Sequence, residues 1–90
     1  MNEQLQKMLG NLKGWNVEDG KLAKLYAFKN YHETMAFVNA LAWISHREDH
    51  HPALQVGYNN CRVEYMTHAI GGLSENDFIC AAKADALFSL

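Results

Sequence analysis

Three of the five histidines in this chain are spaced so that their imidazole rings could act together on a proton. His50 and His51 stand immediately before Pro52, and His68 lies further along the chain. An unperturbed imidazole titrates at about pH 6.5, so at neutral pH one ring can accept a proton while another donates one. Two adjacent imidazolium charges also disfavour each other, which keeps at least one ring neutral. The three residues therefore indicate general acid–base chemistry.

A predicted β-hairpin would bring two of these histidines face to face. Alternating apolar residues flank Asn59-Asn60, and asparagine tolerates the positive φ that a two-residue turn requires. With the turn at that dipeptide, Tyr58 pairs with Cys61. Counting outward from this pair along the antiparallel ladder places His51 opposite His68. This register predicts that the imidazoles converge at one end of the hairpin.

The same residues have plainer interpretations. A lone histidine usually lies on a surface or packs against neighbours. Asp77 could orient or charge-stabilise one imidazole, or it could simply be a carboxylate favoured at a helix N-terminus by the helix dipole. The histidines could bind zinc, although an adjacent His-His pair suits joint coordination poorly. Cys61 and Cys80 are expected to be reduced packing thiols, with a single bridge between them as the alternative.

The composition is typical of one globular domain spanning residues 1–90. The formal net charge of −2 argues against a nucleic-acid-binding protein, because phosphate neutralisation requires clustered Lys or Arg. No apolar stretch approaches the ~18 residues of a membrane span, and the first residues contain no apolar segment typical of a signal peptide. We therefore expect a cytoplasmic protein without membrane association. Oligomerisation would add buried area to so short a chain.

Periodicity and turn signals predict the elements that hold the histidines. Helical spacing of apolar residues predicts helices over 2–12, 31–48 and about 75–87. Asn30 and Glu33 have the N-cap and N3 spacing that begins a helix. Ser74 and Asp77 have the same spacing. Alternating patterns predict extended segments over 15–18, 21–28, 54–58 and 61–67.

Two residues qualify this outline. Pro52 cannot continue a helix, so the histidine pair before it should lie where a helix gives way to extended chain. Lys24 interrupts the apolar alternation of the segment 21–28. The order helix, strand, strand, helix, hairpin, helix predicts an α+β domain.

The spacing of the polar residues resembles the signature of the pterin-4a-carbinolamine dehydratases. The matching positions are His50, His51, Pro52, Tyr58, His68 and Asp77, in a run that begins at His46. In addition, Thr67-His68 followed by Gly71-Gly72-Leu73-Ser74 is similar to a Thr-His-x-x-Gly-Gly-Leu-Thr stretch of that family. The likeness extends over about 15–87. It departs from the family at His46, where an acidic residue is frequent, and at Leu54, where an aromatic residue is common.

The resemblance implies a four-stranded antiparallel sheet with two or three helices packed on one face. It implies dehydration of a 4a-hydroxytetrahydropterin to the quinonoid dihydropterin, as in tetrahydrobiopterin metabolism, without a metal or bound cofactor. The partners would be a small pterin substrate and further copies of the chain in a homodimer or homotetramer. Some members of the family also act as dimerisation partners of a homeodomain transcription factor. A non-catalytic pterin-binding or dimerisation module is therefore the alternative.

The resemblance also implies a role for each site residue. His50 and His68 would share the general acid and base work, and His51 would bind or polarise the pterin. Asp77 and His46 would support this catalytic set. The residues implied to contact substrate are Pro52, Tyr58 and Thr67.

Overall fold

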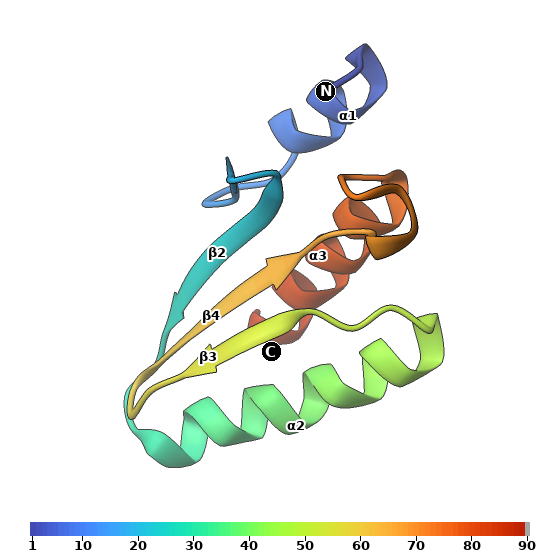
Figure 1. Ribbon diagram of the computed structural model, residues 1–90. Helices are drawn as coiled ribbons and strands as arrows, with labels where there is room; N and C mark the ends of the chain where they lie inside the picture. Colours follow the sequence, from blue (N-terminus) through green and yellow to red (C-terminus); the bar gives the residue numbers. More distant parts are fainter. Residues whose placement is uncertain (90) are drawn as a thin grey trace.

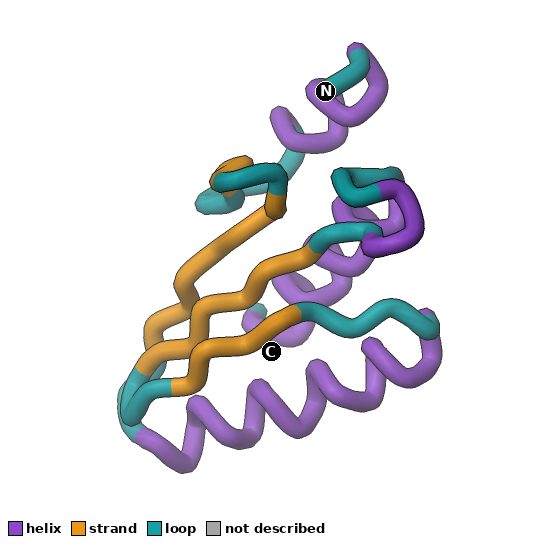
Figure 2. The backbone as a smooth tube through the Cα atoms, in the orientation of Figure 1, coloured by secondary structure: helices purple, strands orange, loops and turns teal. Residues whose placement is uncertain are grey.

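A four-stranded antiparallel sheet, with helices against one of its faces, makes up the computed structural model, which describes residues 1–89 (Figures 1 and 2). The elements are α1 (Glu3–Gly10), β1 (Asn16–Glu18), β2 (Lys21–Ala27), α2 (Tyr31–Glu48), β3 (Ala53–Val56), β4 (Asn60–Tyr65), the 3-10 turn η1 (His68–Ile70) and α3 (Glu75–Phe88). The strand order is β1-β2-β4-β3, with every neighbouring pair antiparallel. The predicted α+β class and sheet are confirmed, and η1 is the element that the sequence did not predict.

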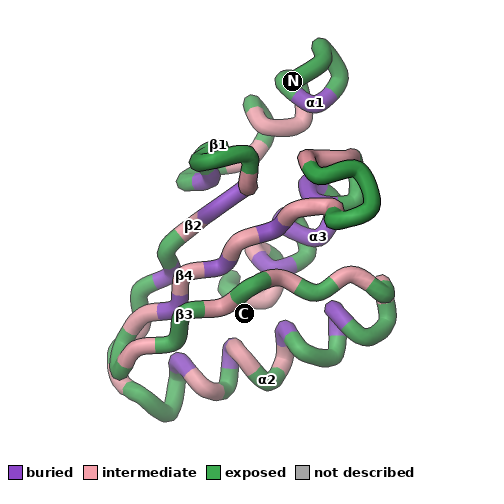
Figure 3. Tube along the Cα trace, in the orientation of Figure 1, coloured by how far each residue is buried: buried purple, intermediate pink, exposed green. Residues whose placement is uncertain are grey.

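The two central strands show why one face of the sheet carries the core. Along β4, Cys61, Val63 and Tyr65 are fully buried, while the residues between them are half-buried. Successive side chains of a strand point to opposite faces, so this alternation places one row inside. The apolar stripe of α2 covers that row, because Phe37 and Leu41 are buried as well (Figure 3). Within residues 1–89, no helix is long and apolar enough to span a bilayer.

The predicted helix starts are confirmed, with one variation. The Asn30 side chain caps α2 by accepting a hydrogen bond from the Glu33 amide at 2.9 Å. The Glu33 carboxylate accepts from the amide of Lys29 at 3.0 Å, one residue earlier than in the usual capping box. Ser74 and Asp77 form a full capping box at the start of α3.

The hairpin register differs from the prediction. Cys61 pairs with Val56 rather than with Tyr58, and the amide of Gly57 donates to the carbonyl of Asn60 at 2.8 Å. The turn is therefore centred on residues 58–59. Asn60 belongs to β4 because it also pairs with Ala27 of β2.

The corrected register changes which residues lie opposite one another. The predicted inward and outward faces of the strands are unchanged, because each pair shifts by two residues along one strand and side chains alternate with a period of two. The predicted residue pairs are changed. Ala53 pairs with Glu64 at the end of the β3–β4 ladder, so the predicted pairing of His51 opposite His68 is wrong.

A cluster of polar side chains around Asp85 links the N-terminal segment to the sheet and α3. The carboxylate of Asp85 in α3 accepts hydrogen bonds from the indole of Trp15, the hydroxyl of Tyr26 and the ammonium of Lys24. The Lys24 ammonium lies 2.9 Å from this carboxylate and also donates to the Lys13 carbonyl at 2.9 Å. Burial and the neighbouring carboxylate raise the pKa of Tyr26, so the phenol stays protonated and donates.

Candidate active site

His50 is held by a buried carboxylate at the point where α2 ends. Asp49 adopts a left-handed backbone conformation, with φ of 51°, and this turns the chain out of the helix. The amide of His50 then donates back to the carbonyl of Ser45 at 3.1 Å. Nε2 of His50 lies 2.6 Å from Oδ1 of Asp77. Asp77 is fully buried, whereas the His50 side chain keeps 15% of its surface exposed.

The second oxygen of Asp77 is equally well occupied. Oδ2 accepts from the hydroxyl of Thr67 at 2.9 Å and from the amide of Ser74 at 2.9 Å. The Thr67 and Ser74 hydroxyl oxygens lie 2.6 Å apart, and Ser74 donates in this pair because the Thr67 proton goes to Asp77. A carboxylate buried in this way has all the hydrogen bonds that its charge requires.

This arrangement selects the reactive nitrogen of His50. An ionised carboxylate only accepts hydrogen bonds, so Nε2 of His50 carries the proton in the bond to Asp77. Nδ1 is then the nitrogen left for a substrate. It can accept a proton when the ring is neutral and donate one when the ring is charged.

A hollow of about 370 Å³ lies beside His50, between the second half of α2 and the chain entering β3. Its volume is within the usual range of small-ligand sites, about 300–1,000 Å³. The residues that line it are Leu41, Ala42, Ser45, His46, Asp49, His50, His51, Pro52 and Leu54. Four of the candidate site residues named from the sequence therefore line this hollow, and these are His46, His50, His51 and Pro52.

The remaining candidate residues are placed differently. Thr67 contacts Asp77 and Ser74 rather than the hollow. His68 is exposed at the start of η1 and does not line the hollow. Its connection to His50 runs through Thr67 and Asp77, not through a cross-strand pair.

Tyr58 lies far from the histidines of the same chain. It lies in the β3–β4 turn, and its carbonyl accepts from the Thr34 hydroxyl in the first turns of α2 at 3.0 Å. Its ring stacks on Tyr31, with centroids 6.4 Å apart. Since His50 follows the last turn of α2, about 24 Å of helix separates the two places, at about 1.5 Å per residue.

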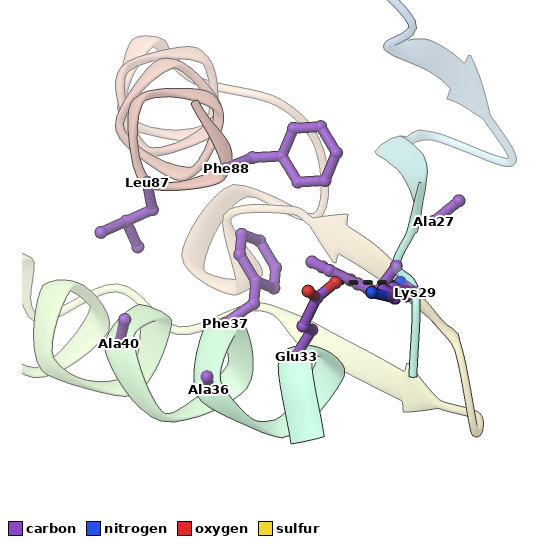
Figure 4. Close-up of a pocket in the computed structure, with 9 residues that line it drawn as sticks. Ala27, Lys29, Glu33, Ala36, Phe37, Ala40, Leu87 and Phe88 are labelled. Carbon is purple, nitrogen blue, oxygen red and sulfur yellow. Dashed lines mark hydrogen bonds between the residues drawn. The ribbon is translucent and has the colours of Figure 1, made fainter. Parts of the chain in front are cut away.

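A larger hollow of about 610 Å³ opens between the start of α2 and the end of α3 (Figure 4). Phe37 and Phe88 project into this region, with ring centroids 6.4 Å apart, and the bond between the Lys29 amide and Glu33 closes one side. Its lining includes no histidine, and the carboxylate of its one acidic residue, Glu33, accepts from the Lys29 amide. The smaller hollow beside His50 is therefore the candidate active site.

The cysteines do not contribute a nucleophile. Cys61 and Cys80 are both buried and unbridged. Burial raises the pKa of both thiols, which keeps them protonated and unreactive. Among residues 1–89, no three His, Cys, Asp or Glu side chains are grouped to hold a metal ion.

Comparison with known proteins places this geometry in a family. A family model described as "Pterin 4 alpha carbinolamine dehydratase" matches residues 1–87. A Nitrosomonas europaea protein with the name "Putative pterin-4-alpha-carbinolamine dehydratase" is 67% identical over 87 residues, which is 96% of this chain and 77% of the relative. A Nitrosospira multiformis protein of the same name is 64% identical over 88 residues, or 98% of this chain and 78% of the relative.

Solved structures agree in fold. The crystal structure of a "transcriptional coactivator/pterin dehydratase" from Brucella melitensis has a TM-score of 0.90 and 28% identity, and the match covers 97% of this chain and 96% of that one. A pterin dehydratase-like protein identified as a RuBisCO assembly factor in the alpha-carboxysome has a TM-score of 0.68 and 28% identity, with 81% and 84% covered. From the family match and the identity to its relatives, the chain belongs to the pterin-4a-carbinolamine dehydratase family.

Proposed function

We propose that this chain dehydrates a 4a-hydroxytetrahydropterin to the quinonoid dihydropterin, with histidines as the acid and base. The reaction breaks the C4a–O bond and removes the proton from N5, so the products are the dihydropterin and water. It needs one group to protonate the leaving hydroxyl and one to accept the N5 proton. The observation that carries the proposal is the bond between His50 and the buried Asp77 at the edge of the hollow.

The roles follow from the chemistry of each ring. His50 takes the N5 proton through Nδ1, and the Asp77 carboxylate stabilises the imidazolium that forms. His51 lies on the same hollow and binds or polarises the pterin. The acid role falls to His68, which lies on η1 outside the lining of the hollow, so the bound pterin must extend beyond that lining to receive its proton. Positioned acid–base groups of this kind typically give about 10²–10⁴-fold acceleration.

The direct test is turnover of a synthetic 4a-hydroxytetrahydropterin by the purified chain. A base must be neutral to accept a proton, and acid removes an imidazole base by protonating it. We therefore expect the enzymatic rate, corrected for the spontaneous reaction, to fall as the pH is lowered from 7.5 to 5. Stopped-flow absorbance of the dihydropterin product would measure it.

Two results would contradict the proposal. A pure binding or dimerisation module would show no acceleration at any pH. A rate that is flat from pH 5 to 8 would show turnover without an imidazole base, and would remove His50 from this role.

A further inference from the structure

The ring of Tyr65 lies flat against the ring of His50. The two ring centroids are 5.7 Å apart, and the ring planes are within 15° of parallel. Tyr65 is the last residue of β4 and is fully buried, and the indole of Trp15 packs against it at 6.1 Å. His50 is therefore bounded by a rigid aromatic surface on one side.

Within the described part of the chain, the hydroxyl of Tyr65 makes no hydrogen bond that could orient His50. It is buried and has no hydrogen-bond partner among residues 1–89. Burial raises the pKa of this phenol, so it remains neutral. A buried polar group without a partner is unfavourable, and phenylalanine would fill the same space without that cost. The contact between Tyr65 and His50 is therefore made by the flat ring.

The ring of Tyr65 adds to a constraint that the bond to Asp77 supplies only in part. A hydrogen bond to Nε2 holds one corner of the imidazole, but it tolerates a range of angles and so limits a tilt of the ring about the Cβ–Cγ bond only loosely. That tilt would swing the lone pair of Nδ1 away from a substrate in the hollow. A parallel aromatic face opposes the tilt, because the offset-stacked contact is lost when the planes diverge.

We infer that Tyr65 is a positioning residue for His50, which sets the plane of the imidazole while Asp77 sets its direction within that plane. The effect on turnover rests on the proposed function, whereas the effect on the ring geometry does not. Small misalignment of a reacting group lowers the rate more than the affinity. The inference thus predicts a change in kcat with little change in KM.

The test compares Tyr65→Phe with Tyr65→Leu. Phenylalanine keeps the flat face and removes the hydroxyl, and leucine fills apolar space without a flat face. We expect Tyr65→Phe to keep kcat within about twofold, and Tyr65→Leu to lose about tenfold in kcat with KM nearly unchanged. In nitrogen-15 NMR spectra, the imidazole shifts of His50 report the hydrogen bond to Asp77 and respond little to the ring current of residue 65, so they should persist in Tyr65→Phe and change in Tyr65→Leu.

A matched control separates positioning from general loss of packing. Phe37→Leu removes another buried aromatic ring that does not touch the His50 hollow, and it should leave kcat and the His50 shifts unchanged. Should Tyr65→Leu fail to fold, Tyr65→Met would take its place, because methionine fills irregular space without a flat face.

Three outcomes overturn the inference. Unchanged His50 shifts in Tyr65→Leu would mean that the stack does not set the ring plane. Changed shifts with unchanged kcat would mean that the plane does not matter for turnover. An equal loss of kcat in Tyr65→Phe would assign the effect to the hydroxyl. If the wild-type chain had no turnover at all, the NMR comparison would still decide the geometric part.

Discussion

Replacing His50 with alanine should lower kcat for the 4a-hydroxytetrahydropterin by about 100- to 10,000-fold, which is the range for loss of a positioned acid or base. Among the described residues that line the hollow, His50 alone is bonded to a fully buried carboxylate, so no neighbour in that lining can replace its oriented Nδ1. Steady-state kinetics at pH 7.5 would measure the loss.

Two further variants make this result specific. His50→Gln keeps an amide that can donate to Asp77 but cannot carry a proton, so it should fold well and remain as inactive as His50→Ala. His32→Ala removes an exposed histidine near the start of α2 and should leave kcat unchanged. Full activity in His50→Gln would show that the proton moves through another residue.

Replacing Asp77 with asparagine should affect both turnover and stability. The asparagine oxygen can still accept from Thr67 and Ser74, but its amide then faces the Nε2–H group of His50, donor against donor. The imidazole would have to place its proton on Nδ1, where a base needs a lone pair. We expect kcat to fall by at least about 100-fold and the free energy of unfolding by about 1–3 kcal/mol.

The control for this variant is a side-chain N-cap on another helix. Asn30→Ala removes the cap of α2 and should cost about 1 kcal/mol of stability while leaving kcat unchanged. Urea denaturation together with kinetics would separate the two effects. An Asp77→Asn variant that is destabilised but fully active would show that Asp77 only caps α3.

The elements could be predicted because their signals are local. The cap at Asn30 and the block at Pro52 are defined by neighbouring residues, so the bounds of α2 were predicted correctly over 31–48. The clustering of His46 with His50 and His51 at the hollow follows from the same local geometry at the helix end.

The parts that depend on distant pairing were not predicted. Asn59-Asn60 is a plausible turn by itself, and only the pairing of Asn60 with Ala27 in another strand moves the turn one residue earlier. Lys24 looks like a break in its strand, yet it follows the alternation and is neutralised by Asp85, far along the chain. The sequence predicts Tyr65 only as one member of an alternating strand, and no neighbouring residue marks it as the partner of His50.

One carboxylate begins α3 and also bonds the histidine, so Asp77 serves two purposes. A related chain without turnover would still gain stability from an acid at this place, because the acid caps its last helix. The presence of that acid in a related chain therefore reports on folding, and the imidazole facing it is the better marker of an enzyme.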